Sequence, residues 1–127
     1  MEILGIHHIA LITANYEKAK EFYCGILGFE VIAENYREAR QSWKCDLAIK
    51  GLYVLELFSF PNPPPKPKIE PCGLRHLAFK VLNVEKTRAE LLAKAVECEE
   101  IRIDEYTNKK FFFIHDPDNV PLEFYEQ

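Results

Sequence analysis

The chain has 127 residues, of which 48% are hydrophobic and 28% charged, and its formal net charge is −4. This length is typical of one domain, and the apolar content excludes disorder over most of the chain. An acidic balance with both signs interspersed argues against a nucleic-acid or anionic-membrane partner. The sequence contains neither a membrane-spanning apolar run nor a signal-peptide pattern, so we expect a cytoplasmic protein.

The first half of the chain predicts one strand, one helix and three further strands. Residues 6–12 are rich in Ile and Leu, as in a strand buried on both faces. A helix follows, with Asn15 as its N-cap and Gly28 as its left-handed stop. Alternation of apolar and polar residues from Trp43 onward indicates a strand with one covered face. The three strands are expected over residues 29–37, 42–49 and 53–58.

A proline-rich segment separates the two halves. Five prolines lie within residues 61–68, and such density precludes a central strand and indicates a stiff, extended connector. We therefore expect one domain over residues 1–127. It consists of a first module over about 4–60, a connector over 61–72 and a second module over about 73–126.

The second half predicts the same order of elements. A strand over 74–81 leads into a helix over 84–95, for which Asn83 is the expected N-cap. The segment Asp116-Pro117-Asp118-Asn119 has the composition of a turn between two strands. The three remaining strands are expected near 99–104, 110–115 and 121–125.

The two halves also repeat each other in sequence. His8-Ile9-Ala10-Leu11 corresponds to His76-Leu77-Ala78-Phe79, and Leu55-Glu56-Leu57-Phe58 corresponds to Leu122-Glu123-Phe124-Tyr125. The distances along the chain agree to within one residue, which indicates a duplicated supersecondary unit. We therefore predict an α+β fold built from two βαβββ modules.

Four of the repeated positions carry ionisable side chains in apolar surroundings. Glu56 and Glu123 lie between apolar neighbours on predicted strands, and a buried carboxylate without a partner is costly or titrates at a higher pH. His8 and His76 lie on the first strand of each module. One divalent cation, whose two charges the two carboxylates would neutralise, offsets the cost of burying all four side chains. We therefore predict that His8, Glu56, His76 and Glu123 bind one metal ion.

Taken singly, each of these residues has an ordinary structural explanation. A core histidine is more often hydrogen-bonded than metal-bound, and a strand glutamate more often faces water at an edge. His7 competes with His8 as the ligand, but the repeat favours His8 because Arg75, a poor ligand, precedes His76. His115 has no counterpart in the first half and is interpreted as surface or pocket wall.

The chain resembles the vicinal-oxygen-chelate superfamily along nearly its whole length, and within it the bacterial glyoxalase I type. The resemblance is carried by Glu21-Phe22-Tyr23, Ile26-Leu27-Gly28-Phe29, Leu55-Glu56-Leu57, His76-Leu77-Ala78-Phe79, and Asp116-Pro117-Asp118 leading to Leu122-Glu123. It implies that the modules form a cup-shaped mixed sheet with the helices outside. It also implies that the four ligands bind nickel, cobalt or zinc, while their chemistry is compatible with manganese or iron as well.

The glutathione-binding positions of glyoxalase I are not kept. The arginine four residues after the first ligand is Ile12 here, and the asparagine four residues after the second is Phe60. The arginine four residues before the third ligand is Cys72. The resemblance therefore implies the metal centre but not the use of glutathione.

These features predict a metal-dependent lyase or isomerase that binds two adjacent oxygens of a small substrate and moves a proton through an enediolate. Glu123 or Glu56 is the expected base, and the sequence does not choose between them. The alternatives are a non-catalytic binding or resistance protein and a thiol transferase of the fosfomycin-resistance type. The expected substrate contacts are Trp43, Phe58, Phe60, Arg37 and Lys109.

Ordinary core packing of the aromatic residues and solvation of the charges remain alternatives to these substrate contacts. Two small open sheets leave edges that must be covered, so we expect a homodimer. The sequence leaves open whether the two modules pair within one chain or between two chains.

Overall fold

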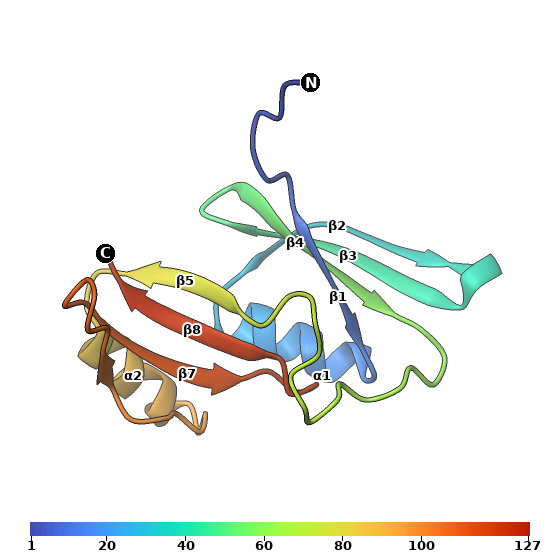
Figure 1. The fold of residues 1–127 in the computed structure, drawn as a ribbon. Coiled ribbons are helices and arrows are strands. Elements are labelled where there is room, and N and C mark those ends of the chain that lie inside the picture. The colour runs from blue at the N-terminus through green and yellow to red at the C-terminus, as the bar shows by residue number, and fades with distance from the viewer. The chain divides into compact units, whose positions relative to one another are not determined.

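The computed structural model describes all 127 residues. They separate into two compact units, Met1–Pro65 and Lys66–Gln127 (Figure 1). The division falls inside the predicted proline-rich connector, and each unit has its own sheet.

The first unit has the predicted order of elements. Its sheet has the order β1-β4-β3-β2, in which β1 runs parallel to β4 and the other neighbours are antiparallel. A left-handed Lys50 and Gly51 connect β3 to β4. The elements are β1 (Ile9–Thr13), α1 (Tyr16–Lys20), η1 (Glu21–Ile26), β2 (Glu30–Arg37), η2 (Glu38–Arg40), β3 (Ser42–Ile49) and β4 (Leu52–Ser59).

The first helix differs from its prediction in one respect. It is α-helical only over Tyr16–Lys20 and continues as a π-helix over Glu21–Ile26. Its ends are as predicted: the Asn15 side chain accepts the Lys18 backbone N–H at 3.1 Å, and Gly28 has a φ of +79°. A single π-turn changes the apolar spacing too little to be seen in the sequence.

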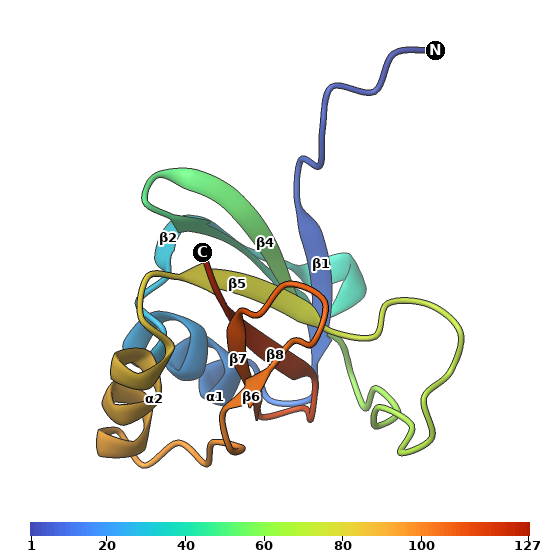
Figure 2. The same cartoon turned by 60° about the vertical axis from the view of Figure 1, so that its left-hand side comes forward.

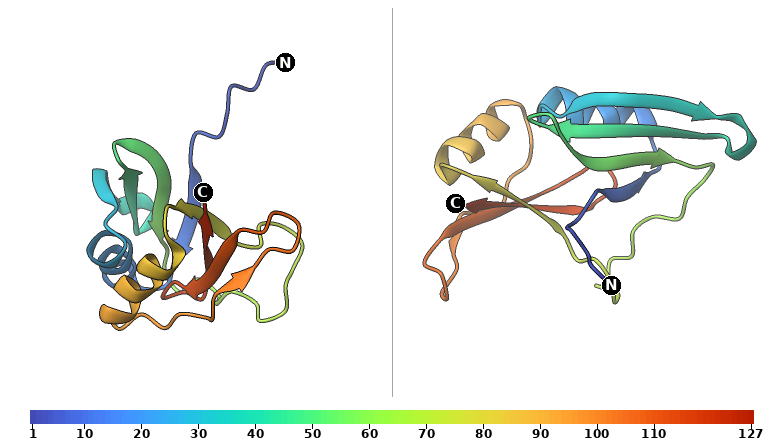
Figure 3. Two further views of the ribbon diagram at one scale, coloured as in Figure 1. Left: turned by 90° about the vertical axis from the view of Figure 1, so that its left-hand side faces the viewer. Right: turned by 90° about the horizontal axis from the view of Figure 1, so that it is seen from above.

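One face of the first sheet packs against this helical segment. Tyr16 stacks on Trp43 with 5.2 Å between ring centroids, and Lys20 Nζ lies 2.6 Å from Glu34 Oε2 on β2. Figure 3 shows the helical segment beside β2 and β3. The strand residues buried on this face are Cys45, Leu47, Leu55 and Leu57.

The second unit repeats this topology. Its sheet has the order β5-β8-β7-β6, again with one parallel pair, β5 with β8. Helix α2 lies against one side of this sheet (Figure 2), and Phe112, Ile114 and Leu122 are buried. The elements are β5 (Leu77–Val81), α2 (Val84–Ala93), β6 (Arg102–Ile103), β7 (Lys110–His115) and β8 (Pro121–Glu126).

The prediction of an α+β fold with two βαβββ modules is confirmed, with two corrections to element bounds. The strand predicted near 99–104 is only Arg102–Ile103, because pairing with β7 is limited to two residues. The first strand of each unit begins at Ile9 and at Leu77, so each histidine immediately precedes its strand. Neither α-helix is long and apolar enough to cross a membrane.

The N-cap of α2 leads to a prediction about stability. Asn83 Oδ1 accepts the Lys86 backbone N–H at 2.7 Å, which satisfies one of the unpaired donors of the first turn. We expect Asn83→Ala to lower the free energy of unfolding by about 1 kcal/mol. Urea unfolding measures this change, and Asn83→Ser, which can cap the helix in the same way, is the control. Equal losses in both variants would contradict the capping role.

Candidate functional site

The first unit brings two of the predicted metal ligands together. His8 Nε2 lies 3.0 Å from Glu56 Oε2, and the two side chains are 33% and 13% exposed. The register explains the contact: Glu56 pairs with Ala10, and His8 lies two residues before Ala10. Because side chains alternate along an extended chain, His8 and Glu56 share one face of the sheet.

The second unit contains the same arrangement. His76 Nε2 lies 3.1 Å from Glu123 Oε2, with 27% and 13% of the side chains exposed. Glu123 pairs with Ala78, again two residues after the histidine. Each unit therefore presents one imidazole nitrogen and one carboxylate oxygen in equivalent geometry.

These donors fit a divalent transition metal. Imidazole nitrogen and carboxylate oxygen suit zinc, nickel, cobalt, manganese and iron, and two carboxylates would neutralise a 2+ charge. A metal-binding imidazole usually makes an outer hydrogen bond with its other nitrogen, and His8 Nδ1 lies 2.8 Å from His7 Nδ1. His76 Nδ1 is buried without a partner. Neither unit by itself gathers three or more donors suited to a metal.

Lys44, Asp46 and Tyr53 surround Glu56 in the first unit. Lys44 Nζ lies 2.9 Å from Glu56 Oε1 and 2.5 Å from Asp46 Oδ1. Tyr53 stacks on the His8 ring, with 5.2 Å between centroids, and its hydroxyl donates to Asp46 Oδ1 at 3.3 Å. An ammonium therefore holds the carboxylate oxygen of Glu56 that does not face His8.

The electrostatics of this group follow from the same contacts. Burial acts to raise the pKa of Glu56, but the hydrogen bond and charge of Lys44 outweigh it and lower that pKa. Hydrogen bonds to Asp46 and Glu56 raise the pKa of Lys44. Burial, together with the charges of these carboxylates, raises the pKa of Tyr53 to about 12. At neutral pH Glu56 is therefore ionised, Lys44 is protonated and Tyr53 is a hydroxyl donor.

Asp46 and Tyr53 were not predicted from the sequence as site residues. Asp46 lies opposite Glu56 in the β3–β4 register, and this placement requires knowledge of which strands pair and where the register shifts. The alternation of Lys44 and Asp46 with buried residues was the available signal. It assigned both residues to the uncovered face, but not to the neighbourhood of Glu56.

Aromatic residues occupy the corresponding positions in the second unit. Phe113 lies opposite Glu123, as Asp46 lies opposite Glu56, and its ring centroid is 5.2 Å from that of His76. The Arg102 guanidinium lies over the Phe111 and Phe113 rings at 5.0 and 5.4 Å from their centroids. The Glu123 carboxylate therefore has the His76 imidazole, but no ammonium, within ion-pair distance.

A small open depression of about 150 Å³ adjoins His76, and Phe113, Arg102 and His115 contribute to its wall. His115 lies at the end of β7, immediately before the turn formed by Asp116 and its neighbours. The prediction of His115 as surface or pocket wall agrees with this position.

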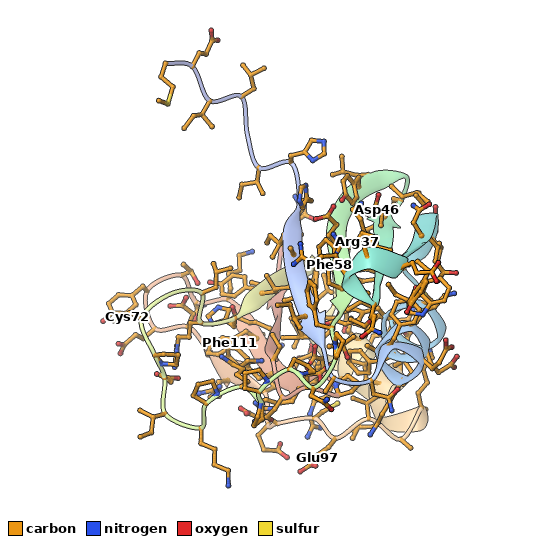
Figure 4. The ribbon with its side chains drawn as sticks, turned by 90° about the vertical axis from the view of Figure 1, so that its right-hand side faces the viewer. Arg37, Asp46, Phe58, Cys72, Glu97 and Phe111 are labelled. Atoms are coloured by element: carbon orange, nitrogen blue, oxygen red, sulfur yellow. The ribbon has the colours of Figure 1, made fainter.

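Three of the five predicted substrate contacts lie together on the first unit. The Arg37 guanidinium is 4.7 Å from the centroid of Phe58, and Phe58 stacks on Phe60 at 6.0 Å. Phe58 is two residues from Glu56 on β4 and therefore shares its face. Figure 4 shows Arg37, Asp46 and Phe58 gathered on the first sheet.

The other two predicted contacts lie elsewhere. Trp43 alternates with Lys44 and lies on the opposite face, against Tyr16 of the helix. Lys109 Nζ donates to the backbone oxygen of Gln127 at 2.8 Å, at the exposed end of the second sheet. The structure therefore groups Arg37, Phe58 and Phe60 near the first His–Glu pair, but not Trp43 or Lys109.

Comparison with known proteins identifies the family. A sequence model of the Glyoxalase/Bleomycin resistance protein/Dioxygenase superfamily matches residues 5–124. The chain therefore belongs to this superfamily, whose members include glyoxalases, fosfomycin-resistance proteins and dioxygenases.

Relatives from several bacteria resemble the chain over nearly all its length. The uncharacterised protein YaeR of Escherichia coli K12 is 57% identical over 123 residues, which cover 96% of this chain and 95% of YaeR. The crystal structure of a glyoxalase family protein from Enterococcus faecalis is 42% identical with a TM-score of 0.92, covering 99% of this chain and 100% of that one.

A more distant structure shares the fold. The fosfomycin resistance protein FosX from Listeria monocytogenes, complexed with Mn(II) and a sulfate ion, is 20% identical with a TM-score of 0.74. The match covers 99% of this chain and 94% of that one. Members of the superfamily thus bind divalent metals such as manganese.

Proposed function

We propose that this protein is a metal-dependent lyase or isomerase of glyoxalase I type that binds two adjacent oxygens of a small substrate. The observation that carries the proposal is the pair of equivalent His–Glu contacts, 3.0 Å in one unit and 3.1 Å in the other. Two largely buried carboxylates, each beside an imidazole, match the donor set of one divalent cation.

In this proposal His8, Glu56, His76 and Glu123 hold one metal ion, either within one chain or across a homodimer. Nickel, cobalt and zinc are the preferred candidates, and manganese or iron is compatible with the same donors. The bound metal would polarise the substrate oxygens as a Lewis acid and stabilise the enediolate left by loss of a C–H proton. The lack of the glutathione-binding side chains at Ile12, Phe60 and Cys72 argues for a substrate without that thiol.

We assign the base to Glu123 rather than to Glu56. A base must offer a free carboxylate oxygen within reach of the proton that it removes. The second oxygen of Glu56 accepts a hydrogen bond from the Lys44 ammonium at 2.9 Å, whereas the only basic side chain within ion-pair distance of Glu123 is the His76 imidazole. Glu56 therefore acts as a fixed ligand, while Glu123 accepts and returns the proton.

Metal analysis and proton exchange together test the proposal. We expect freshly purified protein to contain close to one divalent metal ion per chain, whether the four ligands come from one chain or from two. We also expect the metal-loaded protein to exchange the C–H proton of 2-hydroxyacyl substrates with deuterium from D2O without an added thiol. Treatment with a chelator should abolish the exchange, and restoring the metal should recover it.

Two outcomes would count against the proposal. Protein that neither retains nor takes up a divalent metal would refute the metal centre. Protein that binds metal but exchanges no proton with thiol hemithioacetals or 2-hydroxyacyl compounds would refute catalysis. Tight binding of a flat aromatic ligand in that second case would favour a binding protein, because Phe111, Phe113 and Tyr125 form an aromatic strip beside His76.

A further inference from the structure

Two of the five arginines have no carboxylate partner. Three others are paired: Arg75 with Glu70 at 3.0 Å, Arg88 with Glu100 at 3.0 Å, and Arg102 with Glu99 at 3.2 Å. Arg37 and Arg40 form no ion pair, although acidic residues outnumber basic ones in the chain by 20 to 16. Two adjacent uncompensated guanidiniums in an acidic protein require an explanation.

These two arginines converge on one aromatic residue. The guanidinium carbons of Arg37 and Arg40 lie 5.7 and 5.4 Å from the centroid of the Phe60 ring. Arg37 also lies over Phe58 at 4.7 Å, and its Nη2 donates to the buried Ser42 hydroxyl at 3.0 Å. The two stacked rings and Ser42 hold the Arg37 guanidinium in one orientation.

One N–H donor of the Arg37 guanidinium has no acceptor. Arg37 Nε is buried and has no hydrogen-bond partner. A buried N–H of a charged group without an acceptor is unfavourable, and such groups are rare in folded proteins. A planar guanidinium that is already oriented by stacking is suited to two parallel hydrogen bonds to an oxyanion.

We propose that Arg37 and Arg40 bind an oxyanion group of the substrate, either a phosphoryl group or a carboxylate. The Arg37 guanidinium supplies the directed hydrogen bonds. Arg40 lies on the exposed turn η2 and supplies a second positive charge beside the Phe60 ring. The oxyanion provides the counter-charge that the chain itself does not supply to these two guanidiniums.

The position of this oxyanion site limits the size of the substrate. This inference about size rests on the proposed function. Phe58, beneath Arg37, and Glu56 are two residues apart on one face of β4, which corresponds to about 7 Å. A substrate whose adjacent oxygens meet the metal near Glu56 would therefore carry its anionic group a few atoms away. The substrate class is a small hydroxy-carbonyl compound with a terminal oxyanion.

Thermal unfolding of the metal-free protein tests the oxyanion site independently of catalysis. The melting temperature of the chelator-treated full chain is measured against increasing inorganic phosphate or acetate, with sodium chloride keeping the ionic strength constant. We expect a saturable rise with at least one of the two anions. Arg37→Leu should weaken the fitted anion affinity on the order of tenfold, because a charge-assisted pair is lost.

A matched control separates this effect from general stabilisation by anions. Lys86→Met also removes one positive charge, from the exposed surface of α2, and should leave the anion response unchanged. Without anion, the melting temperature of Arg37→Leu reports what the hydrogen bond to Ser42 and the contacts with Phe58 and Phe60 contribute to stability, and it is the baseline from which the anion response of this variant is fitted. If Arg37→Leu does not fold, Arg40→Leu takes its place and should also weaken the response.

The two anions distinguish the form of the group. A response to phosphate that depends on Arg37 or Arg40 assigns a phosphoryl group, and an equivalent response to acetate assigns a carboxylate. Equal responses of wild type, arginine variant and control to both anions, or no response beyond that to sodium chloride, would overturn the oxyanion site. Because metal is absent throughout, that result would leave the proposed metal-dependent reaction untouched.

Discussion

Replacing His76 by alanine is expected to weaken binding of the divalent metal by at least about a hundredfold. Loss of an outer partner of a metal ligand already costs about 10–100-fold, and loss of the ligand itself removes a direct bond. The change also leaves Glu123 without the imidazole that lies 3.1 Å from its carboxylate. Competition with a metal chelator of known affinity measures the loss.

His115→Ala is the matched control for this experiment. His115 lies on the same unit and lines the depression beside His76, but it forms no ion pair, whereas His76 lies 3.1 Å from Glu123. It should keep the wild-type metal affinity to within a few-fold. In the same way, His7→Ala is the control for His8→Ala. We expect His7→Ala to lose a little metal affinity, because His7 contacts His8 Nδ1. Wild-type affinity in His76→Ala would refute its assignment as a ligand.

Replacing Glu123 by glutamine is expected to lower the turnover number by about 10²–10⁴-fold, the usual contribution of a positioned general base. The amide keeps the shape of the side chain and one oxygen donor but cannot accept the proton. Turnover must be measured at saturating metal, so that weaker metal binding does not contribute to the loss.

Glu56→Gln is the comparison that identifies the base. Lys44 already holds one oxygen of Glu56, so the amide should affect metal affinity more than turnover at saturating metal. A larger loss of turnover in Glu56→Gln than in Glu123→Gln would transfer the role of base to Glu56. Equal losses would mean that neither carboxylate alone accepts the proton.

The internal repeat explains why the His–Glu pairs could be predicted. In each unit the histidine lies two residues before the strand partner of the glutamate, through Ala10 in one and Ala78 in the other. A duplicated unit keeps its register, so nearly equal sequence distances, 48 residues from His8 to Glu56 and 47 from His76 to Glu123, indicated equivalent contacts. The two asparagine caps were predictable for a similar reason, because capping involves residues only three positions apart.

Contacts between strands that are not repeated were not predictable in this way. Lys44 and Asp46 reach Glu56 because β3 pairs with β4 in a register that shifts near Leu47. The second unit has aromatic residues at the matching positions, so the repeat contained no signal for this ammonium and its carboxylates. Trp43 shows the limit of residue type as a signal: its aromatic character suggested a substrate contact, while its place in the alternation puts it on the face that packs against Tyr16 of the helix.

The sequence by itself determined the two βαβββ units, the boundary between them and the residue pairs His8 with Glu56 and His76 with Glu123. Periodicity, capping and strand alternation are local properties, and the duplication extended them to matched positions. Only the tertiary structure decided which charges meet across strands: Lys44 on Glu56, and Arg37 over Phe58 without a carboxylate. Such contacts depend on strand register, which is set by cooperative packing of the whole sheet rather than by any single segment.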